Sequence, residues 1–129
     1  MNNHDVPKPT PSELDMLRLL YALGPATAKQ VHAAALDNRP DITDATVLRL
    51  LQVMHGKGLV TRDESARAHV YAPAQAQDSM QTSLLKDLIH KAFAGSGKAL
   101  VLAALRGGHV TPGERAEIQA LLDADTQQD

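Results

Sequence analysis

Apolar residues recur at helical spacing after residue 43. The repeated positions are Val47, Leu50, Leu51 and Met54, which stand at i, i+3, i+4 and i+7. This spacing predicts a short amphipathic helix that begins at Thr43 and Asp44, because their side-chain oxygens can accept from free amides of the first turn. The opposite face is thinly charged, so it can approach another surface closely. It carries Ala45, Arg49, Gln52 and Gly56.

A β-hairpin is predicted directly after this helix, which ends in a Gly-Lys-Gly turn centred on Lys57. Residues 59–62 form the first predicted strand, 63–67 a polar turn and 68–73 the returning strand. Pro73 closes the hairpin because it lacks an amide donor. The returning strand is expected to be half-buried, with one face toward the core, because Val70 alternates with His69 and Tyr71.

Two further helices are predicted upstream. The first begins at Ser12 and stops at Gly24-Pro25, and the second begins at Thr27 and is broken by Asn38-Arg39-Pro40. Their expected inner positions are Leu14, Leu17, Leu20 and Tyr21 in the first helix, and Val31, Ala34 and Ala35 in the second. Three helices followed by a two-stranded hairpin are typical of a winged helix-turn-helix, with the hairpin as the wing.

Apolar helical segments continue to the end of the sequence. Helices are predicted over 75–94 and 99–105, with a Gly-Ser-Gly hinge between them, and a last helix opens at Thr111 with Pro112 and Glu114 in its first turn. Three short helices cannot close a core of their own, so we expect them to join two copies of the chain in a two-fold dimer. The alternative is that they fold back and complete the core of the winged domain. The predicted dimerisation residues are Leu85, Leu88, Ile89, Phe93, Leu100, Val101, Leu105, Ile118, Leu121 and Leu122.

The predicted fold class is mainly α with a small β-hairpin, arranged as an N-terminal winged helix-turn-helix and a C-terminal helical dimerisation region. Residues 1–11 are expected to form a flexible tail and 12–73 the winged DNA-binding domain. Residues 74–123 are expected to form the three-helix dimerisation region, and 124–129 a polar tail.

The composition excludes or argues against several classes of site and function. The 129 residues include no cysteine, which excludes disulfides, thiolate nucleophiles, redox-sensing thiols and cysteine-bound zinc. The start of the sequence is polar, and no apolar run approaches the ~20 residues that span a bilayer, so a cytoplasmic protein is expected. The absence of Trp and the single Phe argue against stacking on single-stranded nucleic acid.

The formal net charge of −2 is unlike that of a protein that binds nucleic acid mainly by bulk attraction. Residues 1–73 nevertheless hold eight Lys and Arg against eight Asp and Glu, so the acidic surplus lies in the second half. A local positive patch is expected between Arg49 and Pro73, where the acidic residues are Asp63 and Glu64. Few phosphate contacts for each copy imply that tight binding needs two copies on one site. The cations of this patch are Arg49, Lys57, Arg62 and Arg67.

Enzyme and metal sites are weakly indicated. The run Gly95-Ser96-Gly97-Lys98 lacks the glycine, the hydroxyl residue and the preceding strand of a phosphate-binding loop. The histidines show no paired i, i+3 or i, i+4 spacing on one helix, so each is expected to be a surface or capping residue and no metal or cofactor is predicted. They are His4, His32, His55, His69, His90 and His109.

Four groups of short motifs follow one another along the chain. They are Pro25-Ala26-Thr27 with Val31-His32, Thr46-Val47-Leu48 with Leu51, Lys57-Gly58-Leu59-Val60, and Arg67-Ala68-His69-Val70-Tyr71-Ala72-Pro73. Each motif is short, but their order and spacing together resemble the BlaI/MecI family of penicillinase repressors. The resemblance extends from about Pro11 to Leu122.

The resemblance implies a homodimeric transcriptional repressor, not an enzyme, that binds a pseudo-palindromic operator on double-stranded DNA at β-lactamase-type or other antibiotic or stress-response genes. A guanidinium at Arg49, where the family often has threonine, can read guanine through two parallel hydrogen bonds. Arg67 near the wing tip suits a phosphate or the minor groove, although a solvated turn residue is equally typical of that position. The predicted DNA-binding residues are Thr43, Ala45, Thr46, Arg49, Gln52, Lys57, Arg62 and Arg67.

The resemblance also implies a membrane-bound sensor protease as a partner, because β-lactam-responsive relatives are cleaved at an Asn-Phe bond in the tail. Ala103-Ala104 stands at that place here, and two small residues leave the cleavage route open. Copper-responsive relatives have a cysteine-rich tail that this chain lacks. The alternative function is a winged-helix module that contacts proteins and does not bind DNA.

Overall fold

The computed structural model describes residues 7–127, so the predictions for residues 1–6, including His4, and for 128–129 lie outside it. The chain divides into two compact units, Met1–Leu84 and Leu85–Asp129. The elements in chain order are α1 (Pro11–Leu23), β1 (Ala26–Thr27), α2 (Ala28–Ala35), α3 (Asp44–Lys57), β2 (Val60–Asp63), β3 (Val70–Pro73), α4 (Gln77–Ala92), α5 (Gly97–Arg106) and α6 (Pro112–Gln127).

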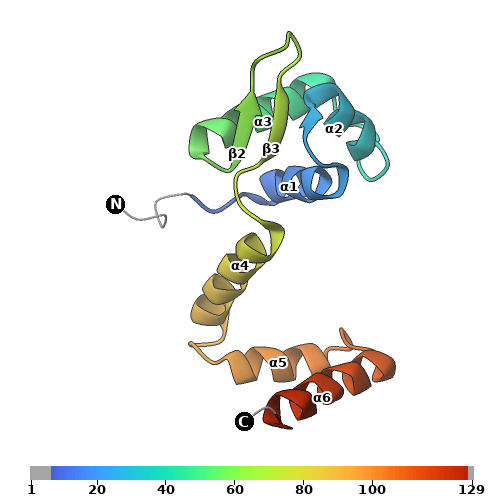
Figure 1. The fold of residues 1–129 in the computed structure, drawn as a ribbon, viewed down its shortest axis with the longest axis vertical. Coiled ribbons are helices and arrows are strands. Elements are labelled where there is room, and N and C mark those ends of the chain that lie inside the picture. The colour runs from blue at the N-terminus through green and yellow to red at the C-terminus, as the bar shows by residue number, and fades with distance from the viewer. Residues whose placement is uncertain (1–6, 128–129) are drawn as a thin grey trace. The chain divides into compact units, whose positions relative to one another are not determined.

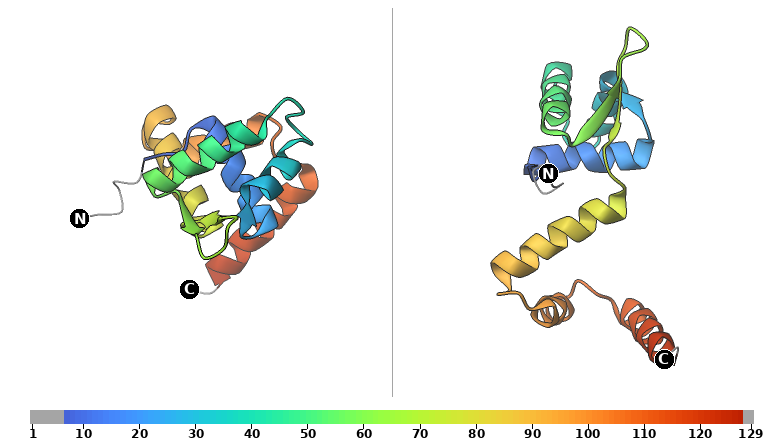
Figure 2. Two further views of the ribbon diagram at one scale, coloured as in Figure 1. Left: turned by 90° about the horizontal axis from the view of Figure 1, so that it is seen from above. Right: turned by 60° about the vertical axis from the view of Figure 1, so that its left-hand side comes forward.

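The first unit is a winged helix-turn-helix, as predicted. Helices α1, α2 and α3 gather beside an antiparallel sheet, and the turn between β2 and β3 projects beyond the helices as the wing (Figures 1 and 2). The sheet has three strands in the order β1-β3-β2. The third strand, β1, was not predicted because two residues are too short to show an alternating pattern. It pairs Ala26 with Tyr71 and Thr27 with Val70, which ties the start of α2 to the wing.

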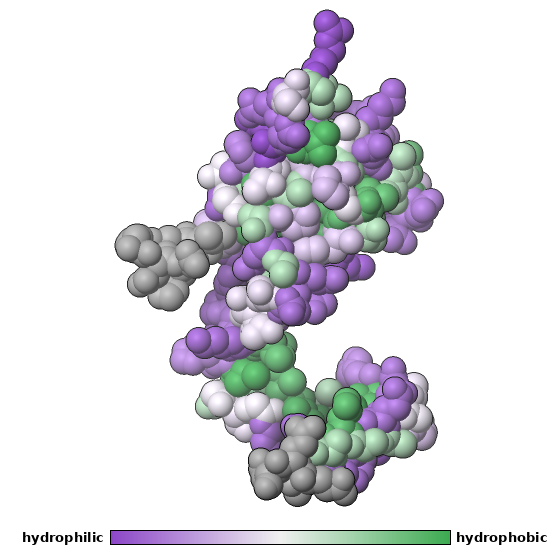
Figure 3. Space-filling view, viewed as in Figure 1, coloured by the Kyte–Doolittle hydropathy of each residue, from purple (hydrophilic) through white to green (hydrophobic). Residues whose placement is uncertain are grey.

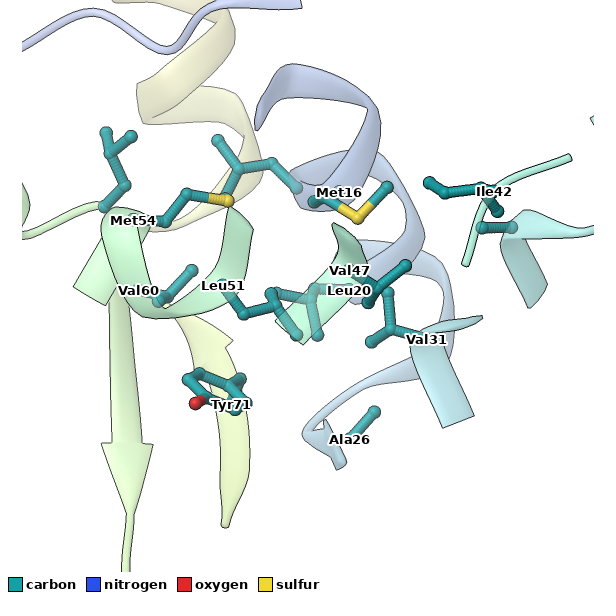
Figure 4. Packing of buried hydrophobic residues seen from close by; sticks show 13 residues of the cluster. Met16, Leu20, Ala26, Val31, Ile42, Val47, Leu51, Met54, Val60 and Tyr71 are labelled. Carbon is teal, nitrogen blue, oxygen red and sulfur yellow. The ribbon is translucent and has the colours of Figure 1, made fainter. Parts of the chain in front are cut away.

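The hydrophobic core lies between these three helices and the sheet. Side chains from α1, α2, α3 and the strands point toward one another in Figure 4. In α3 the predicted inner positions Val47, Leu51 and Met54 are fully buried and Leu50 packs against the cluster, which confirms the helical stripe.

The inner face of α1 differs from the prediction. Leu17 and Leu20 are buried as expected, but Leu14 and Tyr21 are only half-buried. The remaining buried positions are Glu13 and Met16. Residues 13, 16, 17 and 20 form a stripe at helical spacing, which a carboxylate at its first position concealed in the sequence. Thr10 caps α1, because Glu13 N donates to Thr10 Oγ1 and Thr10 N donates to the Glu13 carboxylate.

In β3 the alternation is present but the buried residue is Tyr71, which is 1% exposed, whereas Val70 is half-buried. The tyrosine ring therefore lies between the sheet and the helices (Figure 4). An aromatic side chain buries more apolar area than valine can, so the core gains the larger residue.

The ends of α3 are set by local residues. Thr43 accepts a hydrogen bond from the amide of Thr46 at 3.1 Å, as expected of an N-cap. Gly56 lies inside the helix, and Gly58 alone ends it, with φ of 83° in the left-handed region that glycine adopts without strain.

The boundary between the units falls inside α4, so the second unit contains α4 from Leu85 onward, together with α5 and α6. Phe93 lies just beyond the end of α4. Ser96 caps α5 by accepting a hydrogen bond from Ala99 N, so the Gly-Ser-Gly segment that was predicted as a hinge contains the start of α5. Thr111 and Glu114 form the predicted reciprocal cap of α6. This helix continues through Gln127, where a polar tail from residue 124 was predicted, because no proline or glycine stops it.

Apolar side chains are exposed on the second unit. No residue of α5, and none of α6 up to residue 125, is buried. Hydrophobic residues gather on the surface of these helices in Figure 3. In the described part of the chain, no single helix is long and apolar enough to cross a membrane, whereas α4 and α5 taken as a bent pair pass by length and composition.

Candidate nucleic-acid interface

The solvent side of α3 carries the residues predicted to face DNA. Ala45, Arg49, Gln52 and Gly56 are exposed, and Thr46 is half-buried. Arg49 forms no hydrogen bond or ion pair within the described residues, so its guanidinium is available to another molecule. The face is short, because small side chains flank a single cation and one amide.

A groove of about 320 Å³ lies beside this face, between the first turn of α2, α3 and the wing. It brings together two predicted residues, Gln52 of α3 and Arg67 of the wing. It also contains Lys29, which the sequence analysis missed. Lys29 comes close only because β1 pairs with β3, so no local signal could have placed it there. The residues that line the groove are Ala28, Lys29, Leu48, Gln52, Arg67, Ala68, His69 and Tyr71.

Lys57 does not lie among the groove residues. Its ammonium group donates to both carboxylate oxygens of Glu13, at 3.0 and 2.8 Å. Burial raises the pKa of Glu13, but hydrogen bonds from Lys57 and from the Thr10 amide, together with the Lys57 charge, outweigh it and hold the pKa below its ordinary value. The pair joins the start of α1 to the end of α3.

Arg62 is also engaged within the protein. It donates from Nε to the Glu64 carboxylate at 2.7 Å. This hydrogen bond, together with the attraction of the opposite charges, lowers the pKa of Glu64 and raises the pKa of Arg62. The neighbouring Asp63 accepts from the amide of Ser65 and shapes the turn that leads into the wing tip. Arg67 is exposed and has no ion pair or hydrogen bond within the described residues.

The start of α3 is held by His32, which the sequence analysis expected to be a surface or capping residue. His32 Nε2 lies 2.9 Å from the carbonyl of Ile42, and its Nδ1 lies 2.8 Å from Asp44 Oδ1. The Asp44 carboxylate in the first turn of α3 therefore has a partner across the turn between α2 and α3. The predicted DNA contacts Thr43 and Thr46 are themselves joined by a hydroxyl hydrogen bond of 2.9 Å.

The predicted dimerisation residues lie on α4, α5 and α6 or just beyond α4. Ile89, Phe93, Leu100 and Leu105 are half-buried. The exposed ones are Leu85, Leu88, Val101, Ile118, Leu121 and Leu122. Ala103-Ala104, the candidate cleavage pair, lies inside α5. Within residues 7–127, no three His, Asp or Glu side chains gather as metal ligands would.

Comparisons with known proteins agree with this architecture. A family model described as "Penicillinase repressor" matches residues 9–124. No curated protein sequence matches the chain.

Three solved structures are similar to this chain over part or most of its length. The ferric uptake regulator from Pseudomonas aeruginosa with manganese is 26% identical, with a TM-score of 0.46, over 54% of each chain. This chain thus spans about half the length of that regulator. Monomeric BlaI from Bacillus licheniformis, in complex with the blaP half-operator, is 16% identical, with a TM-score of 0.49, over 57% of this chain and 88% of that one. BpsR from Bordetella bronchiseptica is 19% identical, with a TM-score of 0.44, over 96% and 81%.

Proposed function

Because this chain belongs to the penicillinase repressor family, whose model matches residues 9–124, we propose that it is a homodimeric transcriptional repressor that binds a pseudo-palindromic operator in duplex DNA. The family is one of DNA-binding transcriptional regulators, not of enzymes. The observation that carries the proposal is the pair of unengaged guanidinium groups, Arg49 on the solvent face of α3 and Arg67 on the wing. Together they offer one cation to the bases and one to the backbone.

In this proposal α3 enters the major groove and the wing follows the adjacent backbone. Arg49 reads a guanine through two parallel hydrogen bonds, and Gln52 suits an adenine. Arg67 and Lys29, which line one groove, contact phosphates. Lys57 and Arg62, whose charges are taken up by Glu13 and Glu64, contribute less to phosphate binding than the sequence suggested.

The exposed apolar residues of α4, α5 and α6 support the dimer. An isolated copy leaves six large hydrophobic side chains exposed in this region, and a second copy would cover them. Two α3 helices related by a two-fold axis would then meet two half-sites of one operator. A repressor of this kind acts in the bacterial cytoplasm. Cleavage by a sensor protease at Ala103-Ala104 stays a prediction from the family.

The test is a fluorescence-anisotropy titration against the duplex upstream of the chain's own gene and against a scrambled duplex, at two salt concentrations. We expect preferential binding at two copies for each site, with an affinity that falls steeply with salt because counterions are released from the DNA. Equal binding to both duplexes at both salt concentrations would overturn the operator proposal.

Two substitutions should separate base reading from backbone binding. Arg49→Ala should remove about 1–3 kcal/mol of discrimination between the operator and a variant at one base pair. Arg67→Ala should weaken specific and scrambled duplexes alike and reduce the salt slope by about 1 for each copy. Titrations of both variants on both duplexes measure this division. If the two variants lose preference equally, the assigned roles are wrong.

Two exposed apolar residues of α3 favour a second candidate function. Leu48 is 41% exposed and Val53 is 43% exposed. Such side chains also suit a protein partner, as in a winged-helix module that does not bind DNA. The same titration distinguishes the two functions, since a protein-contact module would show no salt-sensitive binding to either duplex.

A further inference from the structure

We propose that Leu48 recognises the 5-methyl group of a thymine at one fixed position in each half-site. This inference rests on the proposed function, because it concerns how the same surface selects its DNA. Leu48 is exposed on α3 and lines the groove together with Gln52. It therefore stands between the base-reading face of the helix and the wing.

The chemistry of the groove favours a DNA strand as its occupant. Lys29 and Arg67 are both exposed, and neither forms an ion pair within the described residues. Two cations on a groove complement the phosphates of one strand. Between them the groove presents apolar surface from Leu48, Ala28 and Ala68. Every nucleotide of that strand has a phosphate, but among the four bases thymine is the one that presents an apolar group in the major groove, its 5-methyl group.

Helical geometry supplies a matched control for this assignment. At 100° for each residue, Leu48 and Val53 lie on opposite flanks of the exposed face of α3. Their exposed fractions are nearly equal, at 41% and 43%, but only Leu48 lines the groove that holds Arg67. A general hydrophobic contribution from α3 would involve both residues, whereas a thymine contact at the groove involves Leu48 alone.

The experiment uses the full chain and a duplex selected by it from a randomised library. Each thymine of the selected site is replaced in turn by deoxyuridine, which lacks the methyl group but keeps the base pair. We expect one position in each half-site at which deoxyuridine weakens binding about fourfold, the effect of one buried methyl-sized group. Leu48→Ala should bind thymine and deoxyuridine equally there, and Val53→Ala should discriminate as the wild type does. Circular dichroism of both variants checks that they are folded.

The outcomes separate this inference from the function on which it rests. If the wild type prefers a site but tolerates deoxyuridine at every position, the proposed function stands and the thymine contact is overturned. The same holds if Leu48→Ala keeps the discrimination or Val53→Ala loses it. If selection yields no preferred site, the repressor function itself fails, and the thymine contact fails with it.

Discussion

Lys57→Met is expected to lower the free energy of unfolding by about 3 kcal/mol at neutral pH, the lower end of the range for breaking a buried ion pair. The Glu13 side chain is 3% exposed, so it would be left as a buried carboxylate without its cation. We place the effect at the lower end because the Lys57 side chain keeps 29% of its exposure and is already partly hydrated. Urea denaturation of the two proteins measures the difference.

The matched control is Arg18→Met, which removes a cation of α1 that forms an exposed ion pair. Arg18 and Asp15 are 66% and 45% exposed and lie 3.5 Å apart, so this variant should lose less than about 1 kcal/mol. Equal losses in the two variants would show that burial of Glu13 does not decide the effect.

The pH dependence of the same comparison follows from Glu13. Its pKa is lowered in the folded state, so the stability that the pair contributes is fully present above the unfolded pKa and is lost as pH falls through the folded pKa. The difference between the wild type and Lys57→Met should therefore shrink as pH falls below the ordinary range of a glutamate. A difference that stays constant with pH would contradict this assignment.

Leu121→Asp is expected to convert the proposed dimer to a monomer and to weaken binding to a full operator by about 10²–10⁴-fold, because two linked half-sites reinforce each other. Leu121 is 70% exposed on α6, more than any other large hydrophobic residue among those described. A carboxylate there would have to lose its water when a second copy covers the helix. Sedimentation velocity gives the oligomeric state, and anisotropy gives the affinity.

Ala120→Asp is the control for this change, since it adds the same charge one residue away. Position 120 lies on the opposite side of α6 from Ile118, Leu121 and Leu122 by helical spacing. This variant should remain a dimer with nearly unchanged affinity. A Leu121→Asp protein that still sediments as a dimer would contradict the proposed use of α6.

Much of the fold was predictable from local patterns. The spacing of Val47, Leu51 and Met54 predicted α3 and its buried face, and Thr111 with Glu114 predicted the start of α6. Such signals are short range, because helical periodicity and capping depend on residues three or four positions apart. The strand β1 and the burial of Tyr71 were missed, since each depends on pairing between segments far apart in the sequence.

The candidate interface was also predictable from the sequence only in part. The solvent face of α3, with Arg49 and Gln52, and the exposed Arg67 of the wing followed from periodicity and turn position alone. The sequence also presented Lys57 and Arg62 as equivalent cations, although the folded chain pairs them with Glu13 and Glu64. Charge composition counts cations but does not say which are already neutralised.

The amino-acid sequence alone determined the helices, the wing and the family, because those depend on local spacing and on the order of short motifs. Tertiary structure alone decided which charges are available and which residues share the groove. Glu13 meets Lys57 across 44 positions, and Lys29 joins Arg67 only through the pairing of β1 with β3. Contacts of that separation depend on how whole elements pack, and packing is a property of the assembled core rather than of any one segment.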